Sequence, residues 1–84
     1  MNRYLVESKH GAEDCHHVVE QFIYFGHIMN FEWGCEAGEH SSWAMVESES
    51  EAEALLSVPP NLRSKARAIR LTKYTPDKLQ KAHE

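Results

Sequence analysis

The sequence predicts an α+β fold in the order strand–helix–strand–strand–helix–strand. Apolar residues alternate with period two in the predicted strands, and apolar positions with helical spacing or a capping pattern mark the two stretches between them. This order is that of ferredoxin-like βαββαβ folds. Right-handed crossovers then give a four-stranded antiparallel sheet with strand order 4-1-3-2 and both helices on one face.

A hairpin is predicted at residues 31–47, FEWGCEAGEHSSWAMVE, which contain both tryptophans of the chain. Phe31, Trp33 and Cys35 alternate with polar or small residues, as in a half-buried strand. Ala37-Gly38 is the expected turn, because a tight turn needs the positive φ that glycine adopts freely. The strand register stays open, since several loop lengths fit this stretch.

The first strand is predicted at residues 3–9 and the first helix at residues 13–25, where Cys15, Val18, Val19, Phe22 and Phe25 form one apolar stripe. Gly26 is expected to end this helix in a left-handed conformation.

The second helix is predicted to begin at Ser50, which forms a capping box with Glu53, and to end or kink at Pro59-Pro60. The fourth strand is predicted at residues 67–74. Thr75-Pro76 is then the expected start of a short C-terminal helix.

These strands predict two unlike faces of the sheet. The helix-covered face is assigned Tyr4, Val6, Ala44, Val46, Ile69 and Leu71, and the open face Leu5, Glu7, Trp43, Met45, Glu47, Arg70 and Tyr74. A Trp and a Met beside charged groups are typical of an interface, so we expect a homodimer that pairs through the open face.

Length and composition narrow the class of protein. The 84 residues predict a single domain, 1–84, and the sequence lacks a long apolar run and a signal-peptide pattern, so a cytoplasmic protein with two thiols is expected. Ten acids and no Lys or Arg lie between His10 and Pro60, and five bases lie between Arg63 and Lys73. The acidic and basic segments form surfaces that are either separately solvated or complementary across a symmetric contact. Neither a nucleic-acid nor a membrane partner is indicated.

The segments YLVE (4–7), WGCEAGEHSSWAMVE (33–47) and RLTKYTP (70–76) together resemble small, uncharacterised bacterial proteins of the dimeric α/β-barrel superfamily. The resemblance follows the element order over nearly the whole chain. It implies pairing sheet to sheet and a site between sheet and helices or near the dimer interface. It matches no catalytic motif residue by residue, so no catalytic role is carried over.

The predicted topology gathers side chains at one end of the sheet. The end of strand 1, the start of the first helix, the end of strand 2 and the hairpin turn meet there, and they bring His10, Cys15, His16, His17, Cys35 and His40. Such nitrogen and sulfur groups suit a divalent transition metal. The predicted metal ligands are His10, His40 and Cys35, and Trp33, Trp43 and His10 are candidates for binding a small ligand.

The sequence is compatible with more than one role for these cysteines and histidines. Cys15 and Cys35 are equally compatible with buried apolar positions, with the histidines exposed to solvent, because the sequence contains no recognised ligand spacing. The function classes are a small dimeric binding protein for a metal ion or small ligand, a cofactor-independent monooxygenase or isomerase, and a protein interaction module.

The carboxylates of Glu36 and Glu39 lie near the predicted His10–His40 pair. A nearby negative charge favours the protonated imidazole, so this arrangement predicts raised pKa values for both histidines.

Overall fold

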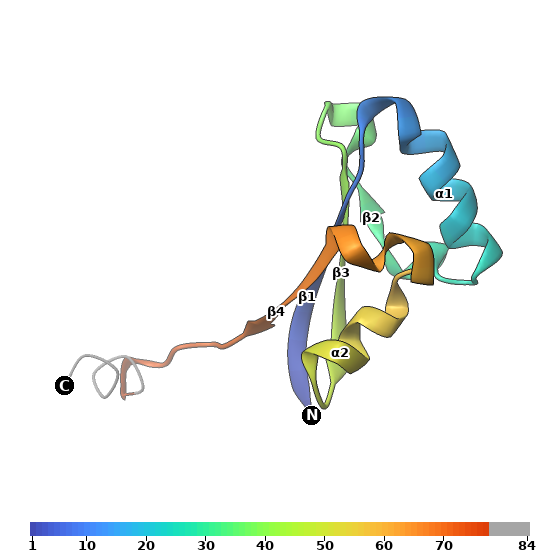
Figure 1. The fold of residues 1–84 in the computed structure, drawn as a ribbon. Coiled ribbons are helices and arrows are strands. Elements are labelled where there is room, and N and C mark those ends of the chain that lie inside the picture. Colours follow the sequence, from blue (N-terminus) through green and yellow to red (C-terminus); the bar gives the residue numbers. More distant parts are fainter. Residues whose placement is uncertain (78–84) are drawn as a thin grey trace.

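A computed structural model describes residues 1–77 and shows an α+β fold with one open, antiparallel sheet of four strands (Figure 1). The strands are β1 (Asn2–Lys9), β2 (Glu32–Trp33), β3 (Ser41–Ser48) and β4 (Ala66–Leu71), and the α-helices are α1 (Cys15–Tyr24) and α2 (Glu51–Ala54). Within residues 1–77 the structure also has five short 3-10 helices: η1 (Ala12–Asp14), η2 (Ile28–Asn30), η3 (Cys35–Ala37), η4 (Leu55–Ser57) and η5 (Pro60–Lys65).

The order across the sheet is β2-β3-β1-β4, which counted from the β4 edge reads 4-1-3-2. Each neighbouring pair is antiparallel, so β1 and β2 run in one direction and β3 and β4 in the other. The β1–β3 pairing is the longest, from Asn2 opposite Ser48 to Lys9 opposite Ser41. The end of β1 and the start of β3 therefore lie side by side.

The core lies between the sheet and the helices. It consists of Tyr4, Val6, Val18, Phe22, Phe31, Ala44, Ala54 and Val58, each at most 6% exposed. Phe22 of α1 is fully buried and meets the rings of Phe31 and Trp33 edge to face, with centroids 4.8 and 4.9 Å apart. Aromatic pairs in this geometry add to the stabilisation from buried area. This contact fixes α1 over the β2–β3 end of the sheet.

Two predicted glycine positions and one predicted helix cap are confirmed. Gly26 and Gly38 have φ values of 79° and 83°, the left-handed region that glycine enters without a steric penalty. The Ser50 hydroxyl accepts a hydrogen bond from the Glu53 amide at 3.1 Å and caps α2. The helix itself is one turn long and continues as η4, and Pro60 begins η5.

The hairpin departs from the expected tight turn. The second strand is only two residues long, and η3 and Gly38 belong to a seven-residue connection between Trp33 and Ser41. Gly34 allows this connection to be compact, because the Cβ of any other residue there would lie 2.6 Å from the carbonyl oxygen of Glu39. The backbone amides of Ala37 and Glu39 also donate to the Gly34 carbonyl. The chain therefore turns away from the sheet before Cys35.

The predicted faces are correct for β1 and β3 and wrong for β4. Ile69 lies opposite Leu5 and Leu71 opposite Arg3, so both are on the open face, while Ala66, Ala68 and Arg70 alternate to the helix side. A one-residue change of register moves every side chain of a strand to the other face. Small alanines suit the helix side, where α2 packs against β4.

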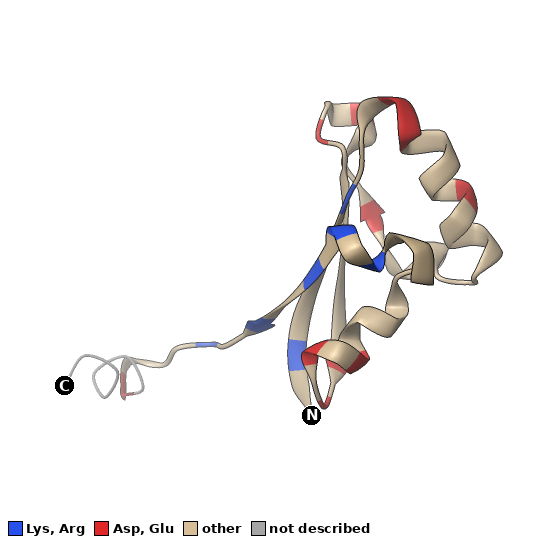
Figure 2. Cartoon of the chain, viewed as in Figure 1, with Lys and Arg blue, Asp and Glu red and all other residues tan. Residues whose placement is uncertain are grey.

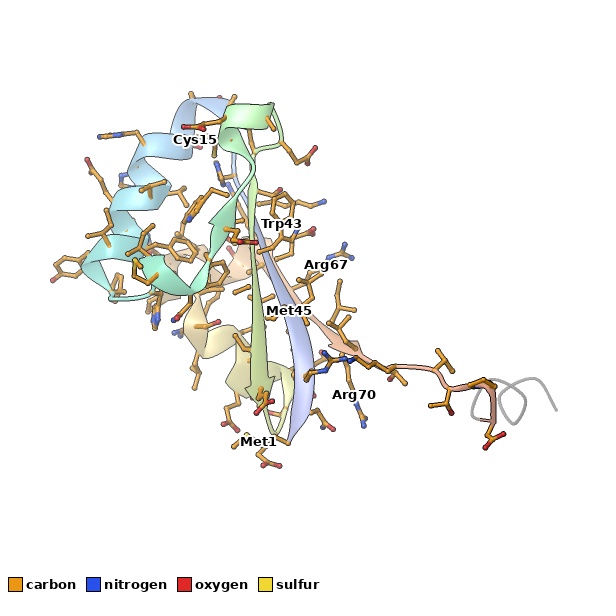
Figure 3. The ribbon with its side chains drawn as sticks, turned by 180° about the vertical axis from the view of Figure 1, so that it is seen from behind. Met1, Cys15, Trp43, Met45, Arg67 and Arg70 are labelled. Atoms are coloured by element: carbon orange, nitrogen blue, oxygen red, sulfur yellow. The ribbon has the colours of Figure 1, made fainter. Side chains whose placement is uncertain are left out.

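The open face is organised in rows that cross the strands. One row is apolar and joins Met45, Leu5 and Ile69. In the next row the indole of Trp43 donates to Glu7 at 2.9 Å, and the guanidinium of Arg67 donates to the other oxygen of Glu7 at 3.1 Å. Figure 3 shows Trp43, Met45 and Arg67 on the side of the sheet away from α1 and α2. Glu7 is therefore held from both neighbouring strands.

Beyond Leu71 the chain leaves the sheet and extends away from the body of the molecule (Figure 1). Tyr74, which was assigned to the open face, thus lies past the end of β4. The expected C-terminal helix falls largely on residues 78–84, outside the described residues. Within residues 1–77, no helix has the length and apolarity needed to cross a bilayer.

The Glu7 contacts predict a pH-dependent stability. The Trp43 hydrogen bond, opposed by burial and assisted by Arg67, lowers the pKa of Glu7 below its ordinary value of 4.5. A lowered folded-state pKa adds stability above the unfolded value, and this stability is lost as pH falls through the folded value. Trp43→Phe should therefore cost about 1.5 kcal/mol near pH 7, as expected for a hydrogen bond to a charged group. Urea unfolding should show this cost shrinking toward about pH 3.

Glu7→Gln serves as the control, because it keeps a hydrogen-bond acceptor that does not titrate over this range. In a Glu7→Gln background, the effect of Trp43→Phe should be independent of pH. The assignment would be contradicted by a cost of Trp43→Phe that is equal at both ends of the pH range in the wild-type background.

Candidate metal centre

Four side chains meet at the end of the sheet where β1 finishes and β3 begins. They are His10, Cys15, Cys35 and His40, and their ligand atoms all lie within 4.8 Å of one another. Nε2 of His10 lies 3.1 Å from Sγ of Cys15 and 3.1 Å from Sγ of Cys35. Nδ1 of His40 lies 3.2 Å from Sγ of Cys15. The four groups form one cluster with two sulfur and two nitrogen atoms facing inward.

Each of the four residues is placed by a separate element. His10 directly follows β1, Cys15 is the first residue of α1, Cys35 begins η3 and His40 directly precedes β3. The amide of His10 donates to the carbonyl of His40 at 3.1 Å, so the β1–β3 pairing extends one residue beyond the sheet. Backbone hydrogen bonding thus holds the two histidines together.

The spacing is close to that of a tetrahedral metal site. Zn–S bonds of about 2.3 Å and Zn–N bonds of about 2.05 Å place sulfur and nitrogen ligands roughly 3.6 Å apart. The three sulfur–nitrogen distances of 3.1–3.2 Å are about 0.4 Å shorter than this. All four ligand atoms lie within 4.8 Å of one another, so small side-chain rotations would bring them to tetrahedral spacing.

Burial sets the protonation of the cluster. The pKa of His10 is lowered from its ordinary value of 6.5, first by burial and then by the charge of His40, and the carboxylate of Asp14 only partly opposes this. The expected rise in the pKa of His10 is therefore wrong. Desolvation of the imidazole exceeds the effect of the nearby carboxylates.

The thiol of Cys35 is also held in its neutral form. Burial, together with the hydrogen bond and charge of Cys15, raises its pKa to about 11. Without a bound ion, the cluster therefore keeps a protonated Cys35 and favours a neutral His10 near neutral pH. A metal ion would replace the thiol proton, because metals bind the thiolate.

The surroundings favour a cation. Asp14, Glu36 and Glu39 belong to the two turns that carry the ligands, and Figure 2 shows acidic residues at the start of α1 and around η3. Their charges create a negative potential that attracts positive ions.

A cavity of about 530 Å³ lies beside the cluster. It is lined by Cys15, His16, Val19, Trp33, Cys35 and Glu36. Both cysteines therefore border open space as well as the cluster, which provides a route for an ion to enter. Among these lining residues the only histidine is His16, whose side chain is 91% exposed and paired with Glu20 at 2.8 Å.

The structure brings together the three predicted ligands, His10, Cys35 and His40, and adds Cys15. The predicted topology places Cys15 at the same end of the sheet but not among the predicted ligands. The overlooked signal is a mirrored spacing: Cys15 comes five residues after His10, and Cys35 comes five residues before His40.

The other predicted candidates take different positions. His16 and His17 lie outside the cluster and are exposed on α1. Trp33 faces the helices, with its ring centroid 6.1 Å from that of His10, whereas Trp43 lies on the open face. The two tryptophans border separate cavities, the one beside the cluster and another of about 390 Å³ on the open face.

Comparisons with protein-family models, curated proteins and solved structures yield no match to this chain. The geometry of the cluster therefore carries the functional argument.

Proposed function

We propose that this chain is a small metal-binding protein that holds one divalent transition-metal ion between His10, Cys15, Cys35 and His40. The observation that carries the proposal is the convergence of four ligand atoms from four elements within 4.8 Å. The function is binding, and the fourth protein ligand leaves no coordination position for a substrate on a tetrahedral ion.

Zn²⁺ fits the donor set best. Two thiolates and two neutral imidazoles around Zn²⁺ form a tetrahedral complex with no net charge. A neutral complex suits these half-buried ligands, because an uncompensated charge is costly to bury. Cu and Ni²⁺ share some of these ligand preferences but favour different geometries.

Ligand substitutions test the proposal. Cys15→Ser, Cys35→Ser, His10→Ala and His40→Ala should each weaken Zn²⁺ binding by about 100-fold or more, since even an outer-shell partner is worth 10–100-fold. Isothermal titration calorimetry measures the affinity. Absorption of the Co²⁺-substituted protein reports thiolate ligation, which should decrease in both Cys variants.

His16→Ala is the matched control. His16 neighbours Cys15 in sequence but is exposed and lies outside the cluster. It should bind Zn²⁺ like the wild type. Equal affinity in all five variants, or no Zn²⁺ binding by the wild type, would refute the proposed site.

The protonation of the cluster predicts the pH dependence of metal binding. Since the pKa of Cys35 is about 11, Zn²⁺ must displace its thiol proton. The affinity for Zn²⁺ should therefore rise from about pH 6 to about pH 8, and proton release should be detectable as a buffer-dependent binding enthalpy. An affinity that stays constant over this range, with no proton release, would exclude thiolate ligation.

We further infer that the chain has a ferredoxin-like topology and belongs to the dimeric α/β-barrel superfamily. The element succession β1-α1-β2-β3-α2-β4 supports this inference. It suggests an occupant for the open face, namely a second copy of the chain.

The residues of the open face favour a symmetric homodimer. Met45 is 56% exposed and Ile69 36% exposed, and both lie in the apolar row centred on Leu5. A two-fold axis along this row would stack the row on its own copy. It would also bring Arg3 of each copy opposite Glu7 of the other, because the two residues lie at equal distances from Leu5 along β1. Such charge complementarity fixes the register of an interface.

Met45→Glu should dissociate this dimer, because it places a negative charge in the apolar row of both copies. Sedimentation equilibrium should show a dimer for the wild type and a monomer for the variant. Leu56→Glu is the control, since Leu56 is equally exposed, at 56%, but lies on the helix layer. A monomeric wild type, or a dimer that survives Met45→Glu, would contradict the pairing.

A further inference from the structure

Four buried side-chain atoms have no hydrogen-bond partner within the described part of the chain. They are Oγ of Ser8, Nδ1 of His10, Nε1 of Trp33 and Oγ of Ser42. Ser8 is 1% exposed and Ser42 is fully buried. Buried polar groups normally have hydrogen-bond partners, and a group left without one destabilises the fold. Four such atoms in a small domain therefore need an explanation.

All four residues belong to one region of the fold. Ser42 lies directly opposite Ser8 on β1 and opposite Trp33 on β2, so three of them form a single row across three strands. His10 follows two residues after Ser8, where the His10–His40 hydrogen bond continues the pairing. The alternation of a strand puts His10 on the same side as Ser8. The row of Ser8, Ser42 and Trp33 is therefore the next row on the same face of the sheet, adjacent to the His10–His40 pair of the cluster.

The hydrogen-bonding capacities of these groups match. Nε2 of His10 faces the two thiols, so a metal ligand at Nε2 requires the tautomer with a proton on Nδ1. Nδ1–H of His10 and Nε1–H of Trp33 are then two donors that need acceptors. The hydroxyls of Ser8 and Ser42 each offer an acceptor oxygen, and each can turn by rotation about a single side-chain bond.

We propose that Ser8 and Ser42 are positioning residues of the metal centre. Their hydroxyls accept hydrogen bonds from Nδ1–H of His10 and Nε1–H of Trp33, directly or through one buried water molecule. The network fixes the imidazole in the tautomer and orientation that present the Nε2 lone pair to the ion. Metal-ligating histidines commonly use their second nitrogen in this way, and losing that partner weakens the site.

The role in metal binding rests on the proposed function, whereas the proposed hydrogen bonds do not require a bound metal. Two measurements therefore test the inference separately. Zn²⁺ affinity reports the effect on the site. Nitrogen-15 NMR of the imidazole rings reports the tautomer of His10 and the exchange of its Nδ1 proton with water, with or without metal.

The test uses Ser8→Ala, Ser42→Ala and the double variant. In the double variant we expect about 10–100-fold weaker Zn²⁺ binding, a mixture of His10 tautomers and faster exchange of the Nδ1 proton. Ser8→Thr and Ser42→Thr, which keep a hydroxyl at each position, should restore the tautomer and most of the affinity.

Ser48→Ala is the matched control. Ser48 is also buried, at 2% exposure, and lies on β3 at the opposite end of the β1–β3 pairing, where its hydroxyl donates to the Ser50 carbonyl. This substitution should lower stability without changing the affinity or the His10 tautomer.

The possible outcomes separate the two proposals. If the wild type binds Zn²⁺ and the double variant binds it equally well with an unchanged tautomer, the positioning role is wrong and the metal site stands. If the wild type binds no metal, the proposed function fails, and the NMR spectra of the metal-free protein still test whether the proposed hydrogen bonds form. A His10 tautomer and proton exchange that are identical in wild type and double variant would then overturn them.

Discussion

The pairing of β1 with β3 is the interaction on which the rest of the structure depends. It runs from Asn2 opposite Ser48 to Lys9 opposite Ser41, and the His10–His40 hydrogen bond extends it. This register decides which side chains face the helices and which form the open face. It also brings together two turns that are 25 residues apart in the sequence, as measured between Cys15 and His40. A one-residue slip would misplace the core and the cluster at the same time.

The cluster of His10, Cys15, Cys35 and His40 and the hydrophobic core are held in place by the same contacts. Phe22 packs against Phe31 and Trp33, and this contact holds α1, which begins with Cys15, over the β2–β3 end of the sheet. Gly34 lets the chain leave β2 abruptly, so that Cys35 turns toward the cluster. The ligands are therefore positioned by elements that other contacts already fix, as a site of defined geometry requires.

Local signals in the sequence were sufficient for much of the fold. Alternation marked β1 and β3, glycine marked the two positive φ positions, and Ser50 with Glu53 marked the start of α2. Local signals could not predict which face of the sheet each β4 side chain occupies, because Ile69 and Leu71 are more apolar than Ala68 and Arg70 and yet lie on the open face. That strand follows the register of β1 and the space left by α2, which are properties of the assembled fold.

The candidate site was likewise predictable from the sequence only in part. Topology alone brought His10, Cys35 and His40 to one end of the sheet. Cys15 could equally have faced the core from the first turn of its helix, and only the packed position of α1 turns its thiol toward His10. The pKa of His10 was also beyond sequence reasoning. Neighbouring carboxylates are visible in a sequence, whereas the depth of burial is not.

The shortness of β2 has a consequence for how the molecule opens. With two paired residues, this edge strand contributes few backbone hydrogen bonds, and the connection that follows it supplies two of the four cluster residues. A bound ion would act as a cross-link between the segments around residues 10–15 and 35–40, closing a loop in a chain with a small core. By analogy with disulfides, closing a loop of some tens of residues lowers the entropy of the unfolded chain and raises the free energy of unfolding by about 3–4 kcal/mol. Loss of the ion would remove this cross-link and leave the packing of Phe22 against Phe31 and Trp33 to hold α1 and the β2 edge on the sheet.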